Sequence, residues 1–445
     1  MDAITAVAHL LRRGFMTVRA VFKPRLLLAI SPQDVSAQTY LTAYMLAARL
    51  WLLRTGAASW PAIHAAWAPE GPTGEGVAAT TGALHGSLDP ADRFELLDDN
   101  AGAFTARERL WASARQSIDV STYYIQGDDT GWAAARQLAA AAGRGVRVRL
   151  ATDAFIARRK TFEGLEMHGV VHFLRQHGVD VRLWSDPRRP YDSNHSKMTI
   201  VDGHTAIIGS RNLGDVYRGP RWRDVELLLM GPSVRHFGPV FERTFHGHGL
   251  ATDASASGEG TVCFDTSPAD VARHPNGRFL LQCARGARRS IDIENAYFIS
   301  HPVLQAELAA AARRGVRVRV FTNSAESNDL PFMNFAMQAG LLPLLTAGVE
   351  VFLRQGAGLT LHCKYFVADA ELVSLGSSNL DYYSPRFNRE ANLQVRDAAL
   401  GAALTAHFER GLATARRLDD APALAADLRK QRLGKLMDTV FRDFQ

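Results

Sequence analysis

The sequence predicts an α/β protein made of two similar halves, each a mixed β-sheet flanked by helices, with an extra N-terminal segment. The chain has 445 residues, which is more than a single hydrophobic core normally supports. Strand-like alternating segments are interleaved with Ala-rich segments of helical composition, an order typical of βαβ units. This order occurs twice with matching residues about 170 positions apart, so the same architecture is expected in both halves.

The repeat is clearest in the predicted strands. Residues 144–150 read Arg-Gly-Val-Arg-Val-Arg-Leu, and residues 314–320 read Arg-Gly-Val-Arg-Val-Arg-Val. Upstream, residues 115–120 match residues 288–293 at Arg, Ser, Ile and Asp. Alternation with a period of two predicts strands, and arginine at strand positions favours an edge or a half-exposed face.

A predicted helix precedes each Val-Arg-Val-Arg strand. Residues 132–142 and 302–314 are rich in alanine, the best helix former. Gly145 and Gly315 lie at the ends of these segments, where a helix favours a residue of left-handed conformation. The two helices are therefore expected to end at equivalent places.

The repeat also sets the predicted domain boundaries. Residues 251–261 are rich in Ser, Gly and Ala, which is the composition of a linker. The expected divisions are an N-terminal extension with a linker (1–95), a first half (96–250), the Ser/Gly/Ala linker, a second half (262–425) and a C-terminal tail (426–445).

The N-terminal extension has the pattern of a basic amphipathic helix. Arg12, Arg19 and Lys23 lie beside an apolar stripe with spacings of three and four, formed by Ile4, Val7, Leu11, Phe15, Val18 and Phe22. Two interpretations stay open: the helix docks on an anionic membrane, or it packs on the protein's own core. Residues 61–87 contain clusters of Pro, Gly and Thr and are predicted to be loop or partly disordered linker.

Net charge and cysteine content indicate which binding partners and which cellular compartment to expect. The net charge of +6 favours anionic partners, and phospholipid head groups and nucleic acid fit it equally well. The three cysteines are widely spaced without a C-x-x-C pair, so neither a disulfide framework nor a structural zinc site is predicted. No apolar run reaches about 18 residues, and basic residues interrupt the place of a signal peptide's apolar core. We expect a cytoplasmic protein associated peripherally with the inner face of the membrane; no pattern predicts its oligomeric state.

Two matched motifs lie inside the repeat. The first contains His195, Lys197, Asp202, Ser210 and Asn212, and the second has the same residue types at the same spacings, namely His362, Lys364, Asp369, Ser377 and Asn379. Residues two apart on a strand point to one face, so each His and Lys should point together, with Ser196 and Cys363 on the opposite face. Asp202-Gly203 predicts a two-residue hairpin turn, whereas the second copy has Asp369-Ala370.

The residue types of the motifs suit a phosphodiester. An imidazole, an ammonium group and neutral donors can each meet a phosphoryl oxygen, with Ser210, Asn212, Ser377 and Asn379 as the neutral phosphate-binding candidates. A single His-x-Lys would more simply be a solvated strand end. Two matched copies favour one shared site, in which two imidazoles supply a nucleophile and an acid.

Both copies carry the signature H-x-K-x4-D-x6-G-S-x-N, and from about residue 94 to about residue 408 the chain resembles the phospholipase D superfamily. The resemblance implies two halves related by a pseudo-twofold axis. Within the superfamily, several segments resemble bacterial phosphatidyltransferases of the cardiolipin synthase type: residues 96–100, 123–125, 128–131, 322–324 and 379–381.

The resemblance also implies a mechanism. One motif histidine attacks phosphorus to form a phosphohistidine, and the other protonates the leaving alcohol. We assign His195 as the nucleophile and His362 as the acid, although two near copies leave this order open. Lys197 and Lys364 would hold the non-bridging oxygens, so neither a metal nor another cofactor is expected.

Carboxylates are expected in two different roles. Asp224 and Glu390 occupy equivalent places after the two motifs, and the resemblance implies that they orient the imidazoles. Asp202 and Asp369 are expected to be structural, because a carboxylate at a tight turn accepts backbone N–H groups.

The resemblance favours membrane glycerophospholipid as the substrate and an alcohol or water as the acceptor. Residues 330–345 are expected to be either a loop that borders the site and receives acyl chains, or a helix buried against the sheet. A nuclease or another nucleic-acid phosphodiesterase is the alternative, and it should show a basic groove with stacking aromatics. A non-catalytic membrane or scaffold protein is a third possibility, which two complete motifs disfavour.

Overall fold

The structure is a computed structural model of the chain. This structure describes residues 54, 59–68, 73–74, 84–154, 167–247, 260–299, 301–330 and 333–431. The predicted amphipathic helix at residues 4–22 and most of the linker at 251–261 lie outside these residues.

The described part of the first half forms a seven-stranded sheet in the order β1-β8-β7-β6-β2-β3-β4. Strands β2, β3 and β4 are parallel, and β6, β7, β8 and β1 continue the sheet in antiparallel fashion. The strands are β1 (Arg93–Leu97), β2 (Ser117–Thr122), β3 (Arg147–Asp153), β4 (Asp180–Trp184), β6 (Met198–Val201), β7 (Thr205–Gly209) and β8 (Glu226–Met230). The helices are α5 (Asn100–Ser113), α6 (Asp129–Gly143), α8 (Met167–Gln176), α9 (Asp215–Arg218) and α10 (Phe237–His246), with the 3-10 helix η4 (Pro232–His236).

The described part of the second half repeats this order within a nine-stranded sheet, β16-β12-β11-β10-β13-β14-β15-β5, with β9 also paired to β15. Its strands are β9 (Cys263–Thr266), β10 (Ser290–Asn295), β11 (Arg317–Asn323), β12 (Glu350–Arg354), β13 (Lys364–Ala368), β14 (Leu372–Gly376), β15 (Asn388–Arg396) and β16 (Ala415–Leu418). Its helices are α11 (Pro275–Gly286), α12 (Pro302–Arg313), α13 (Asn334–Thr346), α14 (Ser384–Phe387), α15 (Ala398–Leu412) and α16 (Ala421–Lys430), with η5 (Pro268–Arg273). Strand β5 (Ser193–Asn194) belongs in sequence to the first half but pairs with β15 of the second.

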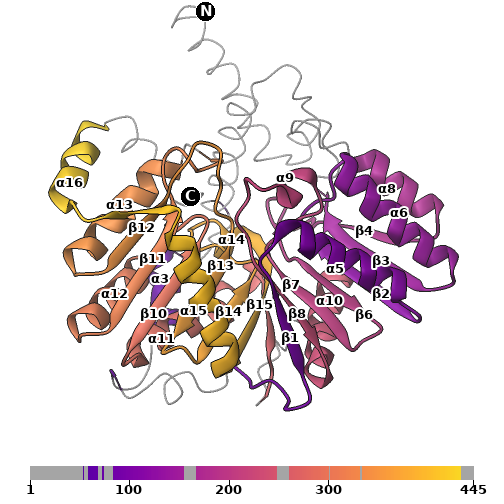
Figure 1. The fold of residues 1–445 in the computed structure, drawn as a ribbon, viewed down its shortest axis with the longest axis horizontal. Coiled ribbons are helices and arrows are strands. Elements are labelled where there is room, and N and C mark those ends of the chain that lie inside the picture. Colours follow the sequence, from indigo (N-terminus) through magenta and orange to yellow (C-terminus); the bar gives the residue numbers. More distant parts are fainter. Residues whose placement is uncertain are drawn as a thin grey trace, which may run out of the picture.

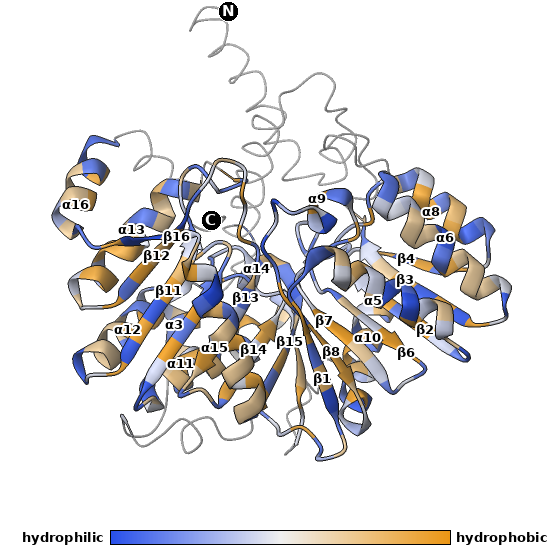
Figure 2. Cartoon of the chain, in the orientation of Figure 1, coloured by the Kyte–Doolittle hydropathy of each residue, from blue (hydrophilic) through white to orange (hydrophobic). Residues whose placement is uncertain are grey.

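The two sheets lie side by side and share a hydrophobic core, which confirms the two-halved α/β fold (Figure 1). Helices α10 and α15 contribute to this central core together with β6 to β8 and β13 to β15. Helices α5, α6 and α8 cover the other face of the first sheet, and α11, α12 and α13 cover the equivalent face of the second. Figure 2 shows hydrophobic residues concentrated along the strands, as burial on both faces requires.

The prediction of an edge or half-exposed face for the strand arginines is correct only in part: Arg147 and Arg317 have side chains that are 53% and 56% exposed, whereas their strands are not at an edge. Arg149 on β3 and Arg319 on β11 lie in the interior of their sheets, and the side chain of Arg319 is 2% exposed. Arg149 donates to Asp119 (Nε–Oδ1, 2.7 Å), and Arg319 donates to Asp292 in the same way (2.6 Å). Burial of a guanidinium is tolerated here because each is paired with a carboxylate at the same position of the repeat.

The two hairpin turns have the same backbone conformation, although one contains glycine and the other alanine. Asp202 and Gly203 have φ of 52° and 71°, and Asp369 and Ala370 have φ of 53° and 55°. Val201 pairs with Thr205 and Ala368 with Leu372, so each turn has three unpaired residues rather than the two expected. Ala370 therefore adopts a left-handed conformation that costs a residue with a Cβ about 1 kcal/mol.

Other segments differ from or refine the predictions. Helix α3 (Trp60–Trp67) overlaps the start of the segment 61–87 predicted as loop, with Ile63 and Trp67 buried against the core of the second half. Strand β1 begins at Arg93, three residues before the expected start of the first half at residue 96. Helix α16 (Ala421–Lys430) continues across the expected end of the second half at residue 425. Residues 334–346 form helix α13, packed on the sheet through Leu341 and Leu344, so the buried-helix alternative is correct. The predicted helix ends at Gly145 and Gly315 are confirmed, with φ of 88° and 90°.

Candidate active site

The two motifs lie at the same place in their sheets, just where a central antiparallel strand begins. His195, Ser196 and Lys197 lead into β6, and His362 and Cys363 lead into β13. Strand β6 pairs antiparallel with β2, so its start lies beside the carboxyl end of β2, where Met198 is opposite Ser121. Strand β13 has the same relation to β10, where Lys364 is opposite Asn295. Sites of α/β sheets commonly occur at this edge.

Each motif is held by the backbone of the opposite half. The amide of His195 donates to the carbonyl of Arg389 (2.9 Å), and the amide of His362 donates to the carbonyl of Arg223 (2.7 Å). The neighbouring residues form parallel pairs, Asn194 with Arg389 and Leu361 with Arg223. The residue after each arginine is therefore placed against a histidine of the other half.

That next residue is the predicted carboxylate in both cases. Nδ1 of His195 lies 2.8 Å from Oε1 of Glu390, and Nδ1 of His362 lies 2.9 Å from Oδ2 of Asp224. Each imidazole is thus paired with the carboxylate that follows the motif of the other half. The sequence did not predict this exchange of partners. With Nδ1 engaged, Nε2 is the nitrogen that remains for chemistry.

The two lysines are buried and lie beside their histidines as the strand period predicts. Lys197 and Lys364 are each 2% exposed, and each Nζ donates to the carbonyl of its motif histidine at 2.6 Å. Ser196 faces the opposite way, where its Oγ lies 2.7 Å from Oδ1 of Asn194. Cys363 is equally buried behind its strand, 3.9 Å from Nε2 of His407.

The four predicted phosphate-binding residues have different surroundings. Ser210 donates to Asp224, and Ser377 exchanges hydrogen bonds with the backbone of Ala391, so both hydroxyls contact protein groups instead of facing only the site. Asn212 donates to Tyr217 Oη at 2.7 Å. Oδ1 of Asn379 is buried and has no hydrogen-bond partner among the described residues. Asn379 thus keeps hydrogen-bonding capacity for a ligand.

The lysine ammonium groups are strongly affected by burial. Burial lowers the pKa of Lys197 to about 7, and the charge of Lys364 acts in the same direction; burial lowers the pKa of Lys364 to about 8, with Asp224 acting against it. Burial and the same two lysines hold the pKa of His195 well below its usual value. Burial and Lys364 lower the pKa of His362 to about 3, against the hydrogen bond to Asp224. A bound anion would reverse these effects, so the site is built to receive negative charge.

The two carboxylates differ in their hydrogen-bond donors. Asp224 accepts hydrogen bonds from Ser210, the amide of Val225 (2.9 Å) and His362. Burial raises the pKa of Asp224, but the hydrogen bond and charge of His362 outweigh burial and hold this pKa below its usual range. Burial raises the pKa of Glu390 to about 8, with Lys197 acting against it. Asp224 is therefore the better partner for a protonated imidazole.

Asp202 and Asp369 lie in the hairpin turns and do not face the histidines. The carboxylate of Asp202 accepts the amides of Arg115, Gln116 and Ser117, the shortest at 2.7 Å. Asp369 accepts the amides at the equivalent positions 288–290. Each fastens the start of a central parallel strand, β2 or β10, to the hairpin that carries the motif.

A further pair of residues supports the motifs and was not singled out from the sequence for this role. Asp153 and Asn323 end the equivalent strands β3 and β11. Oδ2 of Asp153 accepts the amide of Asn194, and Oδ1 of Asn323 accepts the amide of Leu361, both at 2.9 Å. They act on the residue that precedes each histidine, and their equivalent places in the repeat were a signal that could have found them.

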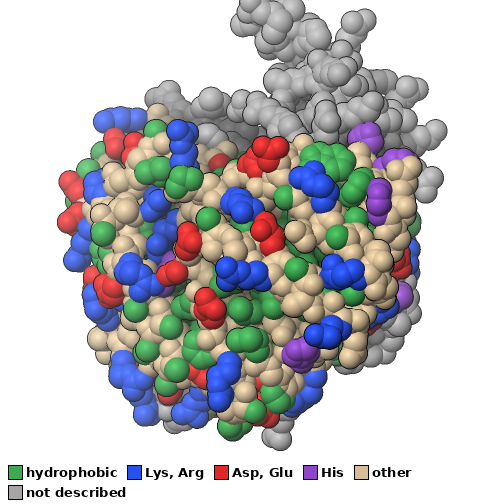
Figure 3. Space-filling model, turned by 45° about the vertical axis from the view of Figure 1, so that its right-hand side comes forward, with side chains coloured by type: hydrophobic (Ala, Val, Ile, Leu, Met, Phe, Trp, Pro, Cys, Tyr) green, Lys and Arg blue, Asp and Glu red, His purple; other side chains and the backbone are tan. Residues whose placement is uncertain are grey.

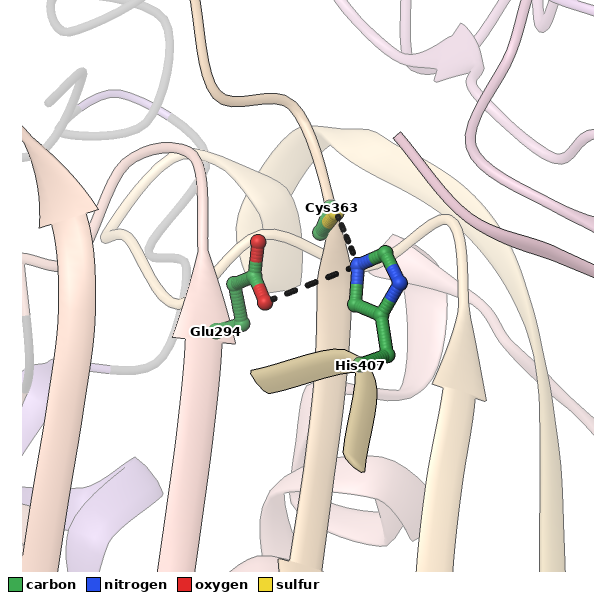
Figure 4. A group of neighbouring side chains, drawn as sticks. All are labelled: Glu294, Cys363 and His407. Atoms are coloured by element: carbon green, nitrogen blue, oxygen red, sulfur yellow. Dashed lines mark hydrogen bonds and ion pairs between the residues drawn. The ribbon is translucent and has the colours of Figure 1, made fainter. Parts of the chain in front are cut away.

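Behind the second motif, Glu294, Cys363 and His407 point toward one another (Figure 4). These side chains are donors that zinc can use, but Glu294 already accepts Nε of Arg223 (2.7 Å) and Oη of Tyr365 (2.6 Å). The pair of Arg223, which is partly buried, and Glu294, which is fully buried, joins the two halves. We infer that this group holds Arg223 in place, and the carbonyl of Arg223 in turn accepts the amide of His362.

The sequence and fold were compared with known proteins. The family model described as "Cardiolipin synthase, PLD-like domain" matches residues 109–217 and 280–412, which together are more than half of the chain. A probable cardiolipin synthase, YwiE of Bacillus subtilis, is 26% identical over an alignment of 360 residues, which covers 76% of this chain and 69% of that protein. A cardiolipin synthase of Geobacillus kaustophilus is 28% identical over an alignment of 300 residues, which covers 63% of this chain and 58% of that protein.

A solved structure has the same fold. Phosphatidylserine synthase of Haemophilus influenzae superposes with a TM-score of 0.65 at 14% identity and covers 81% of this chain and 97% of its own. This likeness concerns the fold, whereas the matched family model spans both motifs. The chain therefore belongs to the phospholipase D superfamily and, within it, to the family of cardiolipin synthase PLD-like domains.

Proposed function

We propose that this chain is a phosphatidyltransferase of the cardiolipin synthase type, which transfers a phosphatidyl group from a glycerophospholipid to an alcohol. The observation that carries the proposal is the pair of cross-half contacts, His195 with Glu390 and His362 with Asp224. They present two Nε2 atoms beside two buried lysines, an arrangement suited to displacement at one phosphorus. The names of the relatives supply the substrate class.

The first step forms a bond between Nε2 of His195 and phosphorus and breaks the bond from phosphorus to the head-group oxygen. His362 gives its Nε2 proton to that oxygen as the alcohol leaves. Asp224 supports this role, because an ionised carboxylate at Nδ1 stabilises the protonated imidazole. The hydrogen-bonded carboxylate thus favours His362 as the acid and His195 as the nucleophile.

The second step reverses these roles. His362 takes the proton of an incoming alcohol, whose oxygen attacks phosphorus as the bond to His195 breaks. Lys197, Lys364 and Asn379 would hold the non-bridging oxygens in both steps. Water in place of the alcohol would give phosphatidic acid, so the same intermediate serves transfer and hydrolysis.

We place the protein at a phospholipid surface because its proposed substrate resides there. Among the helices in the described ranges, none combines the length and apolarity that crossing a bilayer requires. The nuclease alternative has less support. On the face drawn in Figure 3, basic and acidic side chains are interspersed, whereas a strand of nucleic acid favours a continuous basic groove.

The experiment incubates purified protein with phosphatidylglycerol vesicles and, separately, with single-stranded DNA. Cardiolipin and free glycerol are the expected products from the vesicles, and the DNA should stay intact. Cleavage of DNA with unchanged lipid would overturn the proposal and establish the alternative. The His195→Ala protein, prepared in the same way, controls for contaminating activity.

A further inference from the structure

Two equivalent tyrosines at the site have different partners. Tyr124 and Tyr297 each come two residues after a central parallel strand, β2 or β10. Oη of Tyr124 lies 2.7 Å from Oη of Tyr217, a neutral group. Oη of Tyr297 donates to Oδ1 of Asp329 at 2.7 Å. At this pair of tyrosines the pseudo-twofold symmetry is therefore broken by a carboxylate on the side of the second half.

Asp329 belongs to the side of the site that carries His362. The Tyr297 ring, which donates to it, has its centroid 5.9 Å from Nζ of Lys364. The loop that carries Asp329 begins at Asn323, whose side chain accepts the amide of Leu361 and donates to its carbonyl at 2.8 Å. This loop and the residue before His362 are thus held together.

The carboxylate of Asp329 is available to a ligand. Asp329 is exposed, yet the surrounding protein raises its pKa by desolvation, a combination expected of a group that lines a concave site. Tyr297 uses one lone pair of Oδ1, and an ionised carboxylate offers about four. The remaining lone pairs can accept hydrogen bonds from a molecule bound beside Lys364.

The charges near Asp329 select the kind of molecule. A carboxylate accepts hydrogen bonds from either hydroxyl or ammonium groups. The two buried lysines of the site repel an ammonium group but not a neutral alcohol. On the mechanism proposed above, the leaving and the incoming alcohol both react beside His362.

We propose that Asp329 and Tyr297 form the hydroxyl-binding subsite for the alcohol of the transfer reaction, and that they select an alcohol with more than one hydroxyl group. This inference rests on the proposed function. One hydroxyl reacts at phosphorus, and a second donates to Asp329. Water and simple alcohols lack that second contact, so the subsite favours transfer to a polyol over hydrolysis.

The test is a competition between two acceptors of equal carbon number. Phosphatidylglycerol vesicles are incubated with equal concentrations of labelled glycerol and labelled 1-propanol, and the ratio of the two labelled phospholipids is measured. This ratio does not depend on how much of a variant is folded. Wild-type protein is expected to favour glycerol.

Asp329→Asn should lower the ratio at least about tenfold, because a hydrogen bond to a charged acceptor contributes about 1.5–3 kcal/mol. Tyr297→Phe keeps the ring and should lower it about threefold to tenfold. The control is Glu326→Gln, an exposed carboxylate on the same loop whose Oε1 accepts the amide of Gly356 at 2.8 Å. Its ratio should equal that of the wild type.

An unchanged ratio in Asp329→Asn would overturn the inference. A third arm replaces glycerol with ethanolamine: preference for ethanolamine that Asp329→Asn removes would show an ammonium site and would also overturn it. If wild-type protein forms no phosphatidyl alcohol with any acceptor, the proposed function itself fails. If it forms them without preference for glycerol, only the present inference fails.

Discussion

Each motif histidine has one ring nitrogen engaged by a carboxylate and one left for reaction. This is the feature of single residues on which the proposed chemistry depends. The lysines beside them are buried, so their charge is sensitive to pH and to a bound anion. Acid, nucleophile and phosphate-binding roles can therefore be separated by changing one residue at a time.

His195→Ala and His362→Ala should each lower turnover of phosphatidylglycerol by at least about 100-fold. A substrate with p-nitrophenol as the leaving group distinguishes them, because p-nitrophenolate leaves without a proton. The first step of His362→Ala should recover on that substrate, measured as a burst of nitrophenolate, and that of His195→Ala should not. Recovery in His195→Ala alone would reverse the two roles.

The buried lysines predict an alkaline limit to activity. Their pKa values of about 7 and about 8 lie below the ordinary value, so the charged forms are present at low pH and are lost as pH rises through this range. We expect kcat/KM to fall as pH increases above about 7, since it reports the free enzyme. The phosphodiester of the lipid does not titrate there. A constant kcat/KM up to pH 9 would contradict the prediction.

The hairpin is the element that carries each motif, and its turn has the same conformation in both halves despite different sequences. The carboxylates of Asp202 and Asp369 connect each turn to the start of a neighbouring strand through three amides. The stability of the hairpin can thus be changed without touching the reacting groups.

Reciprocal substitutions at the two turns should have opposite effects on stability. Gly203→Ala places a Cβ at positive φ, with open space around it, and should lower the free energy of unfolding by about 1 kcal/mol. Ala370→Gly relieves the same strain and should raise it by about 0.5 kcal/mol, part of the gain being offset by unfolded-state entropy. Urea unfolding measures both. Destabilisation by Ala370→Gly would show that the turn is not strained.

Asp202→Ala and Asp369→Ala test whether these carboxylates are structural. Each leaves backbone amides without their acceptor and should lower the free energy of unfolding by about 1–3 kcal/mol. Turnover per folded molecule, from active-site titration, should change by less than about tenfold. A loss comparable to that of His195→Ala with unchanged stability would instead assign them to catalysis.

Over the whole molecule, the exchange of partners between halves makes the site a property of both. Each histidine takes its amide acceptor and its carboxylate from the opposite half. The ion pair of Arg223 and Glu294 and the shared core fix the two halves in this arrangement.

The exchange predicts which variants should resemble each other. Asp224→Asn should behave like His362→Ala and recover its first step with the p-nitrophenol substrate, although Asp224 follows the first motif. Glu390→Gln should behave like His195→Ala and not recover. The opposite pairing of phenotypes would mean that each carboxylate serves the histidine of its own half. Circular dichroism checks that both variants are folded.

Features that depend on short stretches of chain could be predicted from the amino-acid sequence. Strand period placed each histidine and lysine on one side with Ser196 and Cys363 on the other, and the glycines after the Ala-rich segments marked the helix ends. The repeat predicted two alike halves. These features follow from covalent geometry and local hydrogen bonding, which act over a few residues.

Which groups meet across the molecule could not be predicted from the sequence and became clear from the folded structure. Glu390 contacts His195 although 195 positions separate them, and Tyr297 donates to Asp329, which lies on the loop that follows the neighbouring strand. The burial of Arg319 likewise depends on Asp292 in a neighbouring strand. Such contacts follow from how the two sheets dock, and two near-identical motifs carry no local signal for the exchange between them.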